Sequence, residues 1–170
     1  MSAPVEDVSP RPQERVPFAA WRAFLEVHAV LTRGLDTALQ KEAGIPLTWY
    51  DVLVHVDEAA GGCIRLRELE ERVLVHQSTV SRLAVRLEQA GLLVRTTPAN
   101  DRRSVEVHLT AAGAHRLRQA RAVAIQEIRR GFVAGLHDDD ATQLLRILSS
   151  IRSRNPAHRR NRPVPHRTDC

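Results

Sequence analysis

This chain of 170 residues is poor in cysteine and in aromatic residues, and it contains no long apolar run. Its two cysteines, Cys63 and Cys170, do not make the framework of a small disulfide-stapled domain, which favours a reduced, cytoplasmic location. No apolar stretch approaches the ~20 residues of a membrane-spanning helix, so no membrane partner is expected. The N-terminal segment has no basic region leading into an apolar one, so a secretory signal is not expected either.

The motifs of common enzyme classes are also missing from the sequence. It contains no glycine-rich phosphate loop, no nucleophile elbow and no recognisable Cys-His or His-carboxylate cluster. Its eight histidines include no pair at the i, i+4 spacing of a helical metal site and no cysteine partner pattern. We therefore expect no enzyme activity, no cofactor and no bound metal.

The net charge of +5 is distributed unevenly. Residues 152–170 hold six arginines and one acid, so the first 151 residues are neutral in sum. Within that neutral body, residues 72–103 hold six arginines against only Glu88 and Asp101. A local basic patch of this kind guides a protein towards phosphate more directly than total charge does.

The length suits one domain with a sizeable core between two polar ends. We expect residues 1–16 to be disordered, and likewise the basic tail 152–170. Hydrophobic spacing and turn residues in between predict a mainly α fold with a small β-hairpin. The expected elements are a helix over 17–43, a second helix capped by Thr48 and stopped at Gly61-Gly62, a strand over 64–66, helices over 67–73 and from 77 to Gly91, strands over 93–97 and 104–109, a helix from Thr110, and a last helix from Asp138 to 151.

The most informative segment runs from Gln77 to Thr110. Its helix has an apolar stripe of Val80, Leu83, Leu87 and Ala90, which leaves short polar groups and arginines on the outer side. A helix of this type fits the DNA major groove, and the arginines of the following hairpin turn fit the minor groove or the backbone. The predicted DNA-binding residues are Gln77, Ser78, Thr79, Ser81, Arg82, Arg86, Asp101, Arg102 and Arg103.

Both the polar helix face and the basic turn can also be explained without DNA binding. The polar side of the helix could be only the solvated face of an amphipathic helix, and turns are commonly polar. The order of a short helix, a polar-faced helix and a basic hairpin nevertheless favours a winged helix-turn-helix. In such a wing, an arginine can enter the narrow minor groove while Asp101 orients a neighbouring arginine.

Three phrases in this segment resemble the MarR family of bacterial transcription regulators. They are Leu-Glu-Gln-Ala-Gly at 87–91, Asp-Arg-Arg at 101–103 and Leu-Thr-Ala-Ala-Gly at 109–113. The resemblance covers about residues 17–151. It implies a winged lobe over about 47–109 and dimerisation helices over about 17–43 and 110–151. It also implies a homodimer that represses from a pseudo-palindromic double-stranded DNA operator and is commonly released by a small, often phenolic, ligand. His76-Gln77 departs from the family's usual Ser-type cap, which leaves the operator sequence open.

The residues also favour a dimer without reference to the family. The first and last helices carry more apolar surface than one lobe can cover. A second copy would bury that surface and place two reading helices about 34–36 Å apart, which is one turn of DNA.

A sensor site is harder to define from the sequence. An effector pocket could be lined by Trp21, His28, Trp49, Tyr50 and Asp51, because aromatic walls with one acid suit a planar phenol. The same residues could be plain packing residues, and Asp51 could be a helix cap. Cys63 follows two glycines and lacks a nearby base or second cysteine in sequence, which disfavours a redox role.

The alternative function is a winged-helix module for protein contact, with the basic tail as a non-specific nucleic-acid-binding arm. The arginines at 82, 86, 102 and 103 argue against it, because protein contact alone would not require them.

Overall fold

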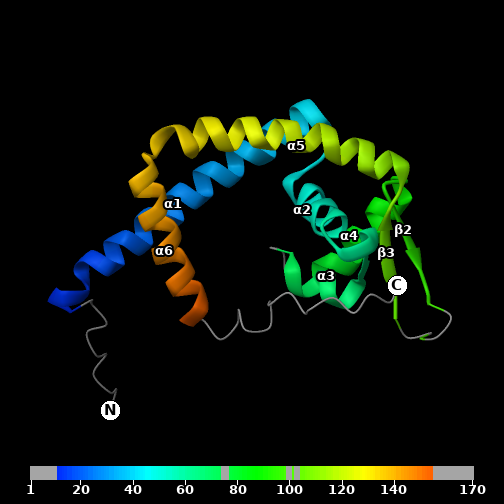
Figure 1. Cartoon of the computed structure of the whole chain (residues 1–170), viewed down its shortest axis with the longest axis horizontal. Helices are drawn as coiled ribbons and strands as arrows, with labels where there is room; N and C mark the ends of the chain where they lie inside the picture. Colours follow the sequence, from blue (N-terminus) through cyan, green and yellow to red (C-terminus); the bar gives the residue numbers. More distant parts are fainter. Residues whose placement is uncertain (1–10, 74–76, 99–100, 102–103, 155–170) are drawn as a thin grey trace, which may run out of the picture.

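The computed structural model of the protein describes residues 11–73, 77–98, 101 and 104–154. A long arch of helices carries a compact lobe at one end (Figure 1). The regular elements are α1 (Arg15–Ala38), α2 (Leu47–Asp57), β1 (Cys63–Arg65), α3 (Leu66–Arg72), α4 (Gln77–Gln89), β2 (Leu93–Thr96), β3 (Glu106–Leu109), α5 (Ala111–Gly131) and α6 (Asp138–Arg154). The fold is mainly α with a small antiparallel sheet, as the hydrophobic spacing predicts.

The first helix begins at Arg15, two residues before the predicted start. It continues beyond Ala38 as one π-helical turn, Leu39–Ala43, and ends at Gly44. Gly44 has φ +67°, the left-handed conformation that glycine adopts at a helix C-terminus without a steric penalty. The predicted stop at this glycine is therefore present.

The start of α2 differs from the prediction. The residue before the helix is Pro46 rather than Thr48, and no side chain of that residue caps the helix. Instead the backbone N–H of Leu47 donates to Asp36 Oδ1 of α1 at 2.7 Å. A carboxylate from another helix thus satisfies a first-turn donor, and it also attaches α2 to α1.

The sheet has three strands in the order β1-β3-β2, all antiparallel. The hairpin of β2 and β3 agrees with the alternation in the sequence, and β1 adds a third strand beside β3. Strand β1 lies one residue earlier than predicted, because Leu66 already belongs to α3. In this register Cys63 faces His108 and Arg65 faces Glu106.

A tight junction joins the lobe to α5. Thr110 precedes the helix, and its Oγ1 accepts a hydrogen bond from the Gly113 N–H at 2.9 Å while donating to the Gly91 carbonyl at 2.6 Å. A Cβ on Gly113 would lie 2.0 Å from the Leu92 carbonyl oxygen. The Leu-Thr-x-x-Gly phrase therefore has a structural reason, since only glycine lets α5 approach the backbone this closely.

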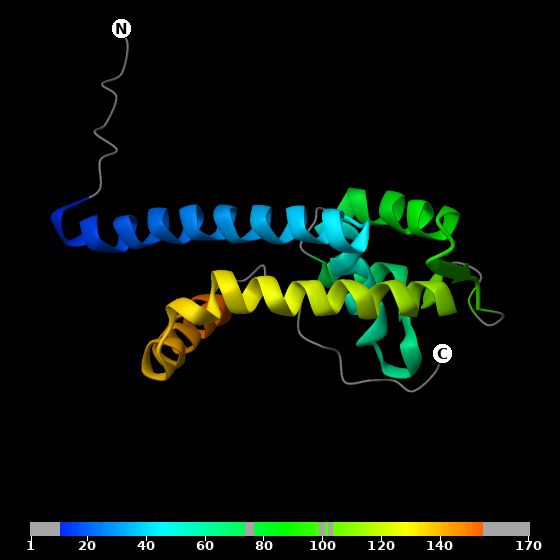
Figure 2. The same cartoon turned by 90° about the horizontal axis from the view of Figure 1, so that it is seen from above.

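The hydrophobic core fills the lobe and reaches into α5. Its fully buried members include Leu53, Leu69 and Leu87 from three different helices of the lobe and Leu117 from α5. Helices α1 and α6 contribute little to this core, because most of their apolar residues are exposed. The two helices cross in Figure 1 but lie apart when the molecule is seen from above in Figure 2. No helix in the described part of the chain is long and apolar enough to cross a membrane.

Candidate nucleic-acid interface

Helix α4 has one buried and one exposed face. Val80, Leu83 and Leu87 are buried in the lobe, as predicted, whereas Arg82 and Arg86 are exposed on the other side. The predicted stripe is wrong at its last position. Ala90 is exposed, because the helix has already ended at Gln89, and Ala84 takes the fourth buried place.

The short polar side chains of α4 do not all lie on its outer face. Thr79 and Ser81 are both half-buried, and Ser81 Oγ donates to Glu70 Oε1 at 3.0 Å. Glu70 belongs to α3, so this contact holds the two helices of the helix-turn-helix together. In this conformation the Ser81 hydroxyl proton is committed to Glu70. Gln77 and Ser78 lie in the first turn of α4, and their side chains fall outside the described residues.

The turn between β2 and β3 is described in part. Arg102 and Arg103 lie outside the described residues. The N–H of Asp101 donates to the Pro98 carbonyl at 3.2 Å, and the Asp101 carbonyl accepts from the Ser104 N–H at 3.0 Å. Asp101 is therefore held through its backbone from both sides, and its side chain is exposed.

The basic patch is smaller than the count of arginines indicates. Arg95 donates from its backbone N–H and its Nε to Glu88, at 3.1 and 2.8 Å. Arg72 forms an ion pair with Glu68 on the same helix. These two arginines are therefore partly neutralised within the lobe. Arg82 and Arg86 are the exposed arginines of α4.

The pair of Glu88 and Arg95 also fixes the wing. It joins the last turn of α4 to strand β2, which leads into the hairpin tip. The hydrogen bonds from the Arg95 side chain and backbone lower the pKa of Glu88 below its usual value. Glu88 is therefore ionised at neutral pH, and besides reducing the charge of the patch it has this structural role.

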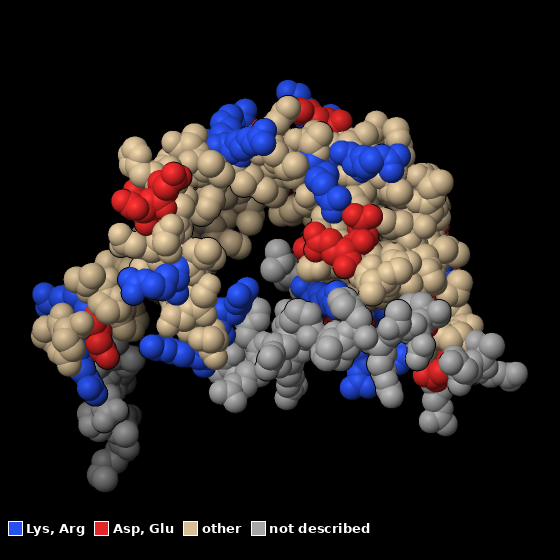
Figure 3. Space-filling model, in the orientation of Figure 1, with Lys and Arg blue, Asp and Glu red and all other residues tan. Residues whose placement is uncertain are grey.

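Charge is spread unevenly over this side of the molecule. Acidic side chains gather near the middle of the lobe, and basic side chains appear both along its lower edge and above it along α5 (Figure 3). The lower edge is the side of α3, while α5 runs along the opposite, upper side (Figure 1).

The predicted effector residues lie on two separate helices. Trp21 and His28 belong to α1, where Phe24 stacks against both rings at centroid distances of 6.0 and 6.2 Å. Trp21 is 56% exposed. Fifteen helical residues, about 22 Å, separate Trp21 from Asp36, the point at which α1 is attached to α2. Within one protomer, Trp21 is therefore not close to the start of α2.

The other three predicted effector residues follow one another on α2. Trp49 and Tyr50 are half-buried and pack against the lobe core. Asp51 lies inside α2 and does not cap it. Its Oδ1 is 3.5 Å from Nε2 of His55, one turn later in the same helix. Burial raises the pKa of Tyr50, and the neighbouring Arg121 of α5 partly offsets the rise.

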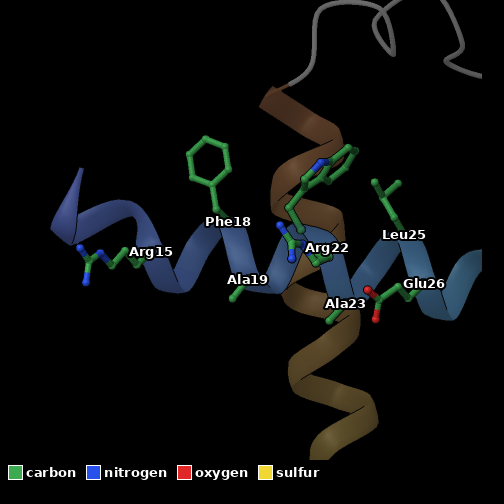
Figure 4. A pocket seen from close by; sticks show the side chains of 8 residues that line it. Arg15, Phe18, Ala19, Arg22, Ala23, Leu25 and Glu26 are labelled. Atoms are coloured by element: carbon green, nitrogen blue, oxygen red, sulfur yellow. The ribbon is translucent and has the colours of Figure 1, made fainter. Parts of the chain in front are cut away.

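An open pocket of about 640 Å³ lies along the N-terminal half of α1. All eight described lining residues belong to this one helix, and they include Phe18, Trp21 and Leu25 (Figure 4). It contains Trp21 but none of the predicted effector residues of α2. Because a single helix forms it, we interpret it as part of an uncovered helix face.

Cys63 does not have the free thiol expected from the composition. It is buried on β1 and is disulfide-bonded, while Cys170 lies outside the described residues.

Comparison with known proteins agrees with this architecture. A sequence model of the MarR family matches residues 43–104, which include α2, the helix-turn-helix and the beginning of the wing. AbsC, a MarR family transcriptional regulator from Streptomyces coelicolor, has a similar structure with a TM-score of 0.77 and 29% identity, covering 86% of this chain and 97% of that one. The chain is therefore similar to MarR family transcriptional regulators, both in the sequence of this segment and in its overall fold.

Two further relatives support this similarity. The MarR family regulator Sco3205 from the same organism, solved in complex with DNA, has a TM-score of 0.77 and 26% identity, covering 85% of this chain and 91% of that one. YkoM of Bacillus subtilis (strain 168), described as an uncharacterized HTH-type transcriptional regulator, is 33% identical over 84 residues, or 49% of this chain. The chain spans about half the length (54%) of this curated relative.

Proposed function

We propose that this protein is a MarR family regulator, a sequence-specific DNA-binding transcriptional repressor that acts in the cytoplasm as a homodimer. The single observation that carries the proposal is the face of α4 that holds Arg82 and Arg86. Both arginines are exposed on a helix whose other side is fixed in the lobe core. An arginine can bind guanine bidentately or contact phosphate, and a rigidly held helix can place it in the major groove. Sco3205, solved with DNA, supports this use of the fold.

The remaining predicted DNA contacts belong to the same proposal. We assign Gln77, Ser78 and Thr79 to the beginning of the reading helix, and Asp101, Arg102 and Arg103 to the wing. Ser81 has a different role, because its hydroxyl already donates to Glu70. It supports the helix pair and reaches DNA only if that contact breaks.

The homodimer is supported by the outer helices. Large apolar side chains are exposed along α1, at the end of α5 and along α6, a pattern that marks a protein interface. In the described part of the chain they are Val16, Phe18, Trp21, Phe24, Leu25, Val27, Val30, Ile125, Ile128, Phe132, Val133, Leu145, Ile147, Leu148 and Ile151. We therefore assign residues 17–43 and 110–151 to dimerisation and residues 47–109 to DNA reading.

We also propose that a small, planar effector of phenolic type releases the repressor. Trp49, Tyr50 and Asp51 lie on α2, which packs against both the lobe core and α5. A ligand bound there would contact both the reading and the dimerising parts of the molecule. Trp21 would have to join such a site through the dimer, given its distance from α2 along α1, whereas His28 lies nearer to the attachment point at Asp36.

The experiment compares DNA binding by wild-type protein and Arg86→Ala. Fluorescence anisotropy across a salt series would use the protein's own upstream DNA and a scrambled duplex of equal length. We expect wild-type protein to prefer the upstream duplex. Arg86→Ala should weaken that binding by about 1–3 kcal/mol through loss of one charged groove contact.

The matched control is Arg118→Ala. Arg118 is an equally exposed helical arginine, but it lies on α5, on the upper side of the lobe. This variant should bind like wild type. Equal losses in the two variants, or an unchanged affinity for Arg86→Ala, would contradict the assignment of α4 as the reading helix.

A further inference from the structure

A cluster of three side chains on the small sheet is not explained by DNA reading. Cys63 of β1 faces His108 of β3 in the strand register, and Glu106 lies two residues before His108 on the same strand. Side chains two apart on a strand point to the same face. The thiol sulfur, a carboxylate oxygen and a ring nitrogen of this triad all lie within 4.8 Å of one another.

Glu106 is the unusual member of the triad. It is 7% exposed and is the one charged residue that is buried in the described part of the chain. Its carboxylate has no hydrogen bond or ion pair with another described residue. Its oxygens keep some contact with solvent. Carboxylates on residues with so little exposure are nevertheless commonly paired or bound to a metal. The carboxylate instead points at two further metal-binding groups.

We propose that Cys63, Glu106 and His108 form a binding site for one divalent transition-metal ion of the zinc type when the protein is reduced. Sulfur, imidazole nitrogen and carboxylate oxygen are the three donors that zinc takes in proteins. In a tetrahedral site such donors are roughly 3.5 Å apart, given zinc bonds of 2.0–2.3 Å. The triad therefore needs a contraction of up to about 1.3 Å from its limit of 4.8 Å, which side-chain rotation can supply.

The surroundings of His108 fit a ligand role. Thr96 of β2 places its hydroxyl 3.1 Å from His108 Nε2. Metal-binding histidines commonly have their second ring nitrogen held by such a partner, which fixes the ring and its tautomer. Here the partner comes from the third strand, so the site involves all three strands of the sheet. With three protein ligands, the fourth position of the ion is left for water.

The redox state of Cys63 controls the site. Its sulfur is disulfide-bonded in the structure, so the disulfide must be reduced before it can bind metal. Two electrons from a thiol reductant and two protons convert the disulfide into two thiols, and the reductant is oxidised to its own disulfide. Metal binding then displaces the Sγ proton and gives a thiolate ligand. The disulfide and the metal therefore exclude each other at Cys63.

The test uses the full chain with Cys170→Ser, in which Cys63 is the single thiol and no intramolecular disulfide can form. Cobalt(II) is titrated as a spectroscopic probe in the presence of a phosphine reductant, and zinc is then added in competition. We expect one ion per chain, a thiolate-to-cobalt band in the near ultraviolet and the visible bands of tetrahedral cobalt. Zinc should displace the cobalt and remove both signals.

Three variants of that protein assign the ligands. Cys63→Ser should abolish the thiolate band, while Glu106→Gln and His108→Asn should each weaken binding by more than about tenfold. His115→Asn removes an exposed histidine from α5 and should bind like the parent. Reduced wild-type protein is titrated in parallel, so the result does not depend on the folding of the Cys170→Ser variant.

Two outcomes would overturn the proposal. One is the absence of a thiolate band in both reduced proteins. The other is tight binding that survives all three ligand substitutions, which would place the metal elsewhere. Oxidised wild-type protein should lack the thiolate band, and an identical band before and after reduction would contradict the redox control of the site.

Discussion

The reading lobe (residues 47–109) and the outer helices (α1 and α6) both carry apolar side chains at helical spacing, but only the lobe buries them. Leu53, Leu69 and Leu87 are fully buried in the lobe. Trp21 and Leu145 on the outer helices are 56% and 68% exposed. The lobe therefore has a core of its own, whereas the outer helices have an apolar face that another molecule must cover. In the proposed homodimer, this difference separates residues that keep the protein folded from those that would assemble it.

The largest expected effect is Leu87→Ala. Leu87 is fully buried where α4 meets the lobe core, so the substitution should lower the free energy of unfolding by about 2–5 kcal/mol. Urea denaturation of the variant and the wild type measures this difference in the free energy of unfolding. Val94→Ala changes an exposed aliphatic side chain of the same lobe and should cost less than about 1 kcal/mol. Similar costs for the two variants would mean that the lobe core is not packed as described.

The junction between the lobe and α5 should be almost as sensitive. Gly113→Ala places a Cβ 2.0 Å from the Leu92 carbonyl oxygen, and overpacking of this kind costs about 1–3 kcal/mol or more. Thermal denaturation should show a clear loss of stability. Gly34→Ala meets no atom within 4 Å in the middle of α1, and it should leave stability unchanged or raise it.

A substitution on an outer helix should separate assembly from folding. Leu145→Glu places a charge on the exposed apolar face of α6, so the dimer dissociation constant should rise more than about tenfold. Sedimentation equilibrium measures the constant, and circular dichroism checks that the helices remain. Gln143→Glu adds the same charge at an exposed polar position of α6 and serves as the control. A dimer unaffected by Leu145→Glu would remove α6 from the interface.

The smallest effect is expected for Glu88→Gln, which weakens the attachment of the wing to α4. Arg95 lowers the pKa of Glu88 in the folded protein, so their contact stabilises the fold at neutral pH. This stabilisation is lost as the pH falls through the lowered pKa, because Glu88 then becomes protonated. The Arg95 amide should exchange with solvent faster in the variant at neutral pH, and the two proteins should converge in acid. Glu127→Gln, in the α5 pair with Arg130, should leave that amide unchanged.

Local patterns in the sequence predicted most of the reading lobe. The order of helices, the hairpin, the outward arginines of α4 and the stop at Gly44 all depend on spacing and turn residues within a few positions. The MarR resemblance rests on the same short phrases. The junction at Gly113 shows why one of those phrases has its form.

Contacts between distant residues could not be predicted in this way. The bond from Leu47 to Asp36 and the donation from Ser81 to Glu70 each span eleven positions and depend on tertiary packing. The triad on the sheet is a clearer case. Histidine pairs at helical spacing are the recognisable metal signal in a sequence, whereas Glu106 and His108 are two apart on a strand and Cys63 comes from the strand beside them.

In the proposed homodimer, one lobe reads DNA only together with the lobe of its partner. Sedimentation velocity of a labelled upstream duplex, titrated with wild-type protein and with Leu145→Glu, tests it most directly. We expect two protein chains per duplex for the wild type, and binding to the same duplex that is much weaker for the variant. A single chain bound per duplex, with equal affinity in both proteins, would contradict the account.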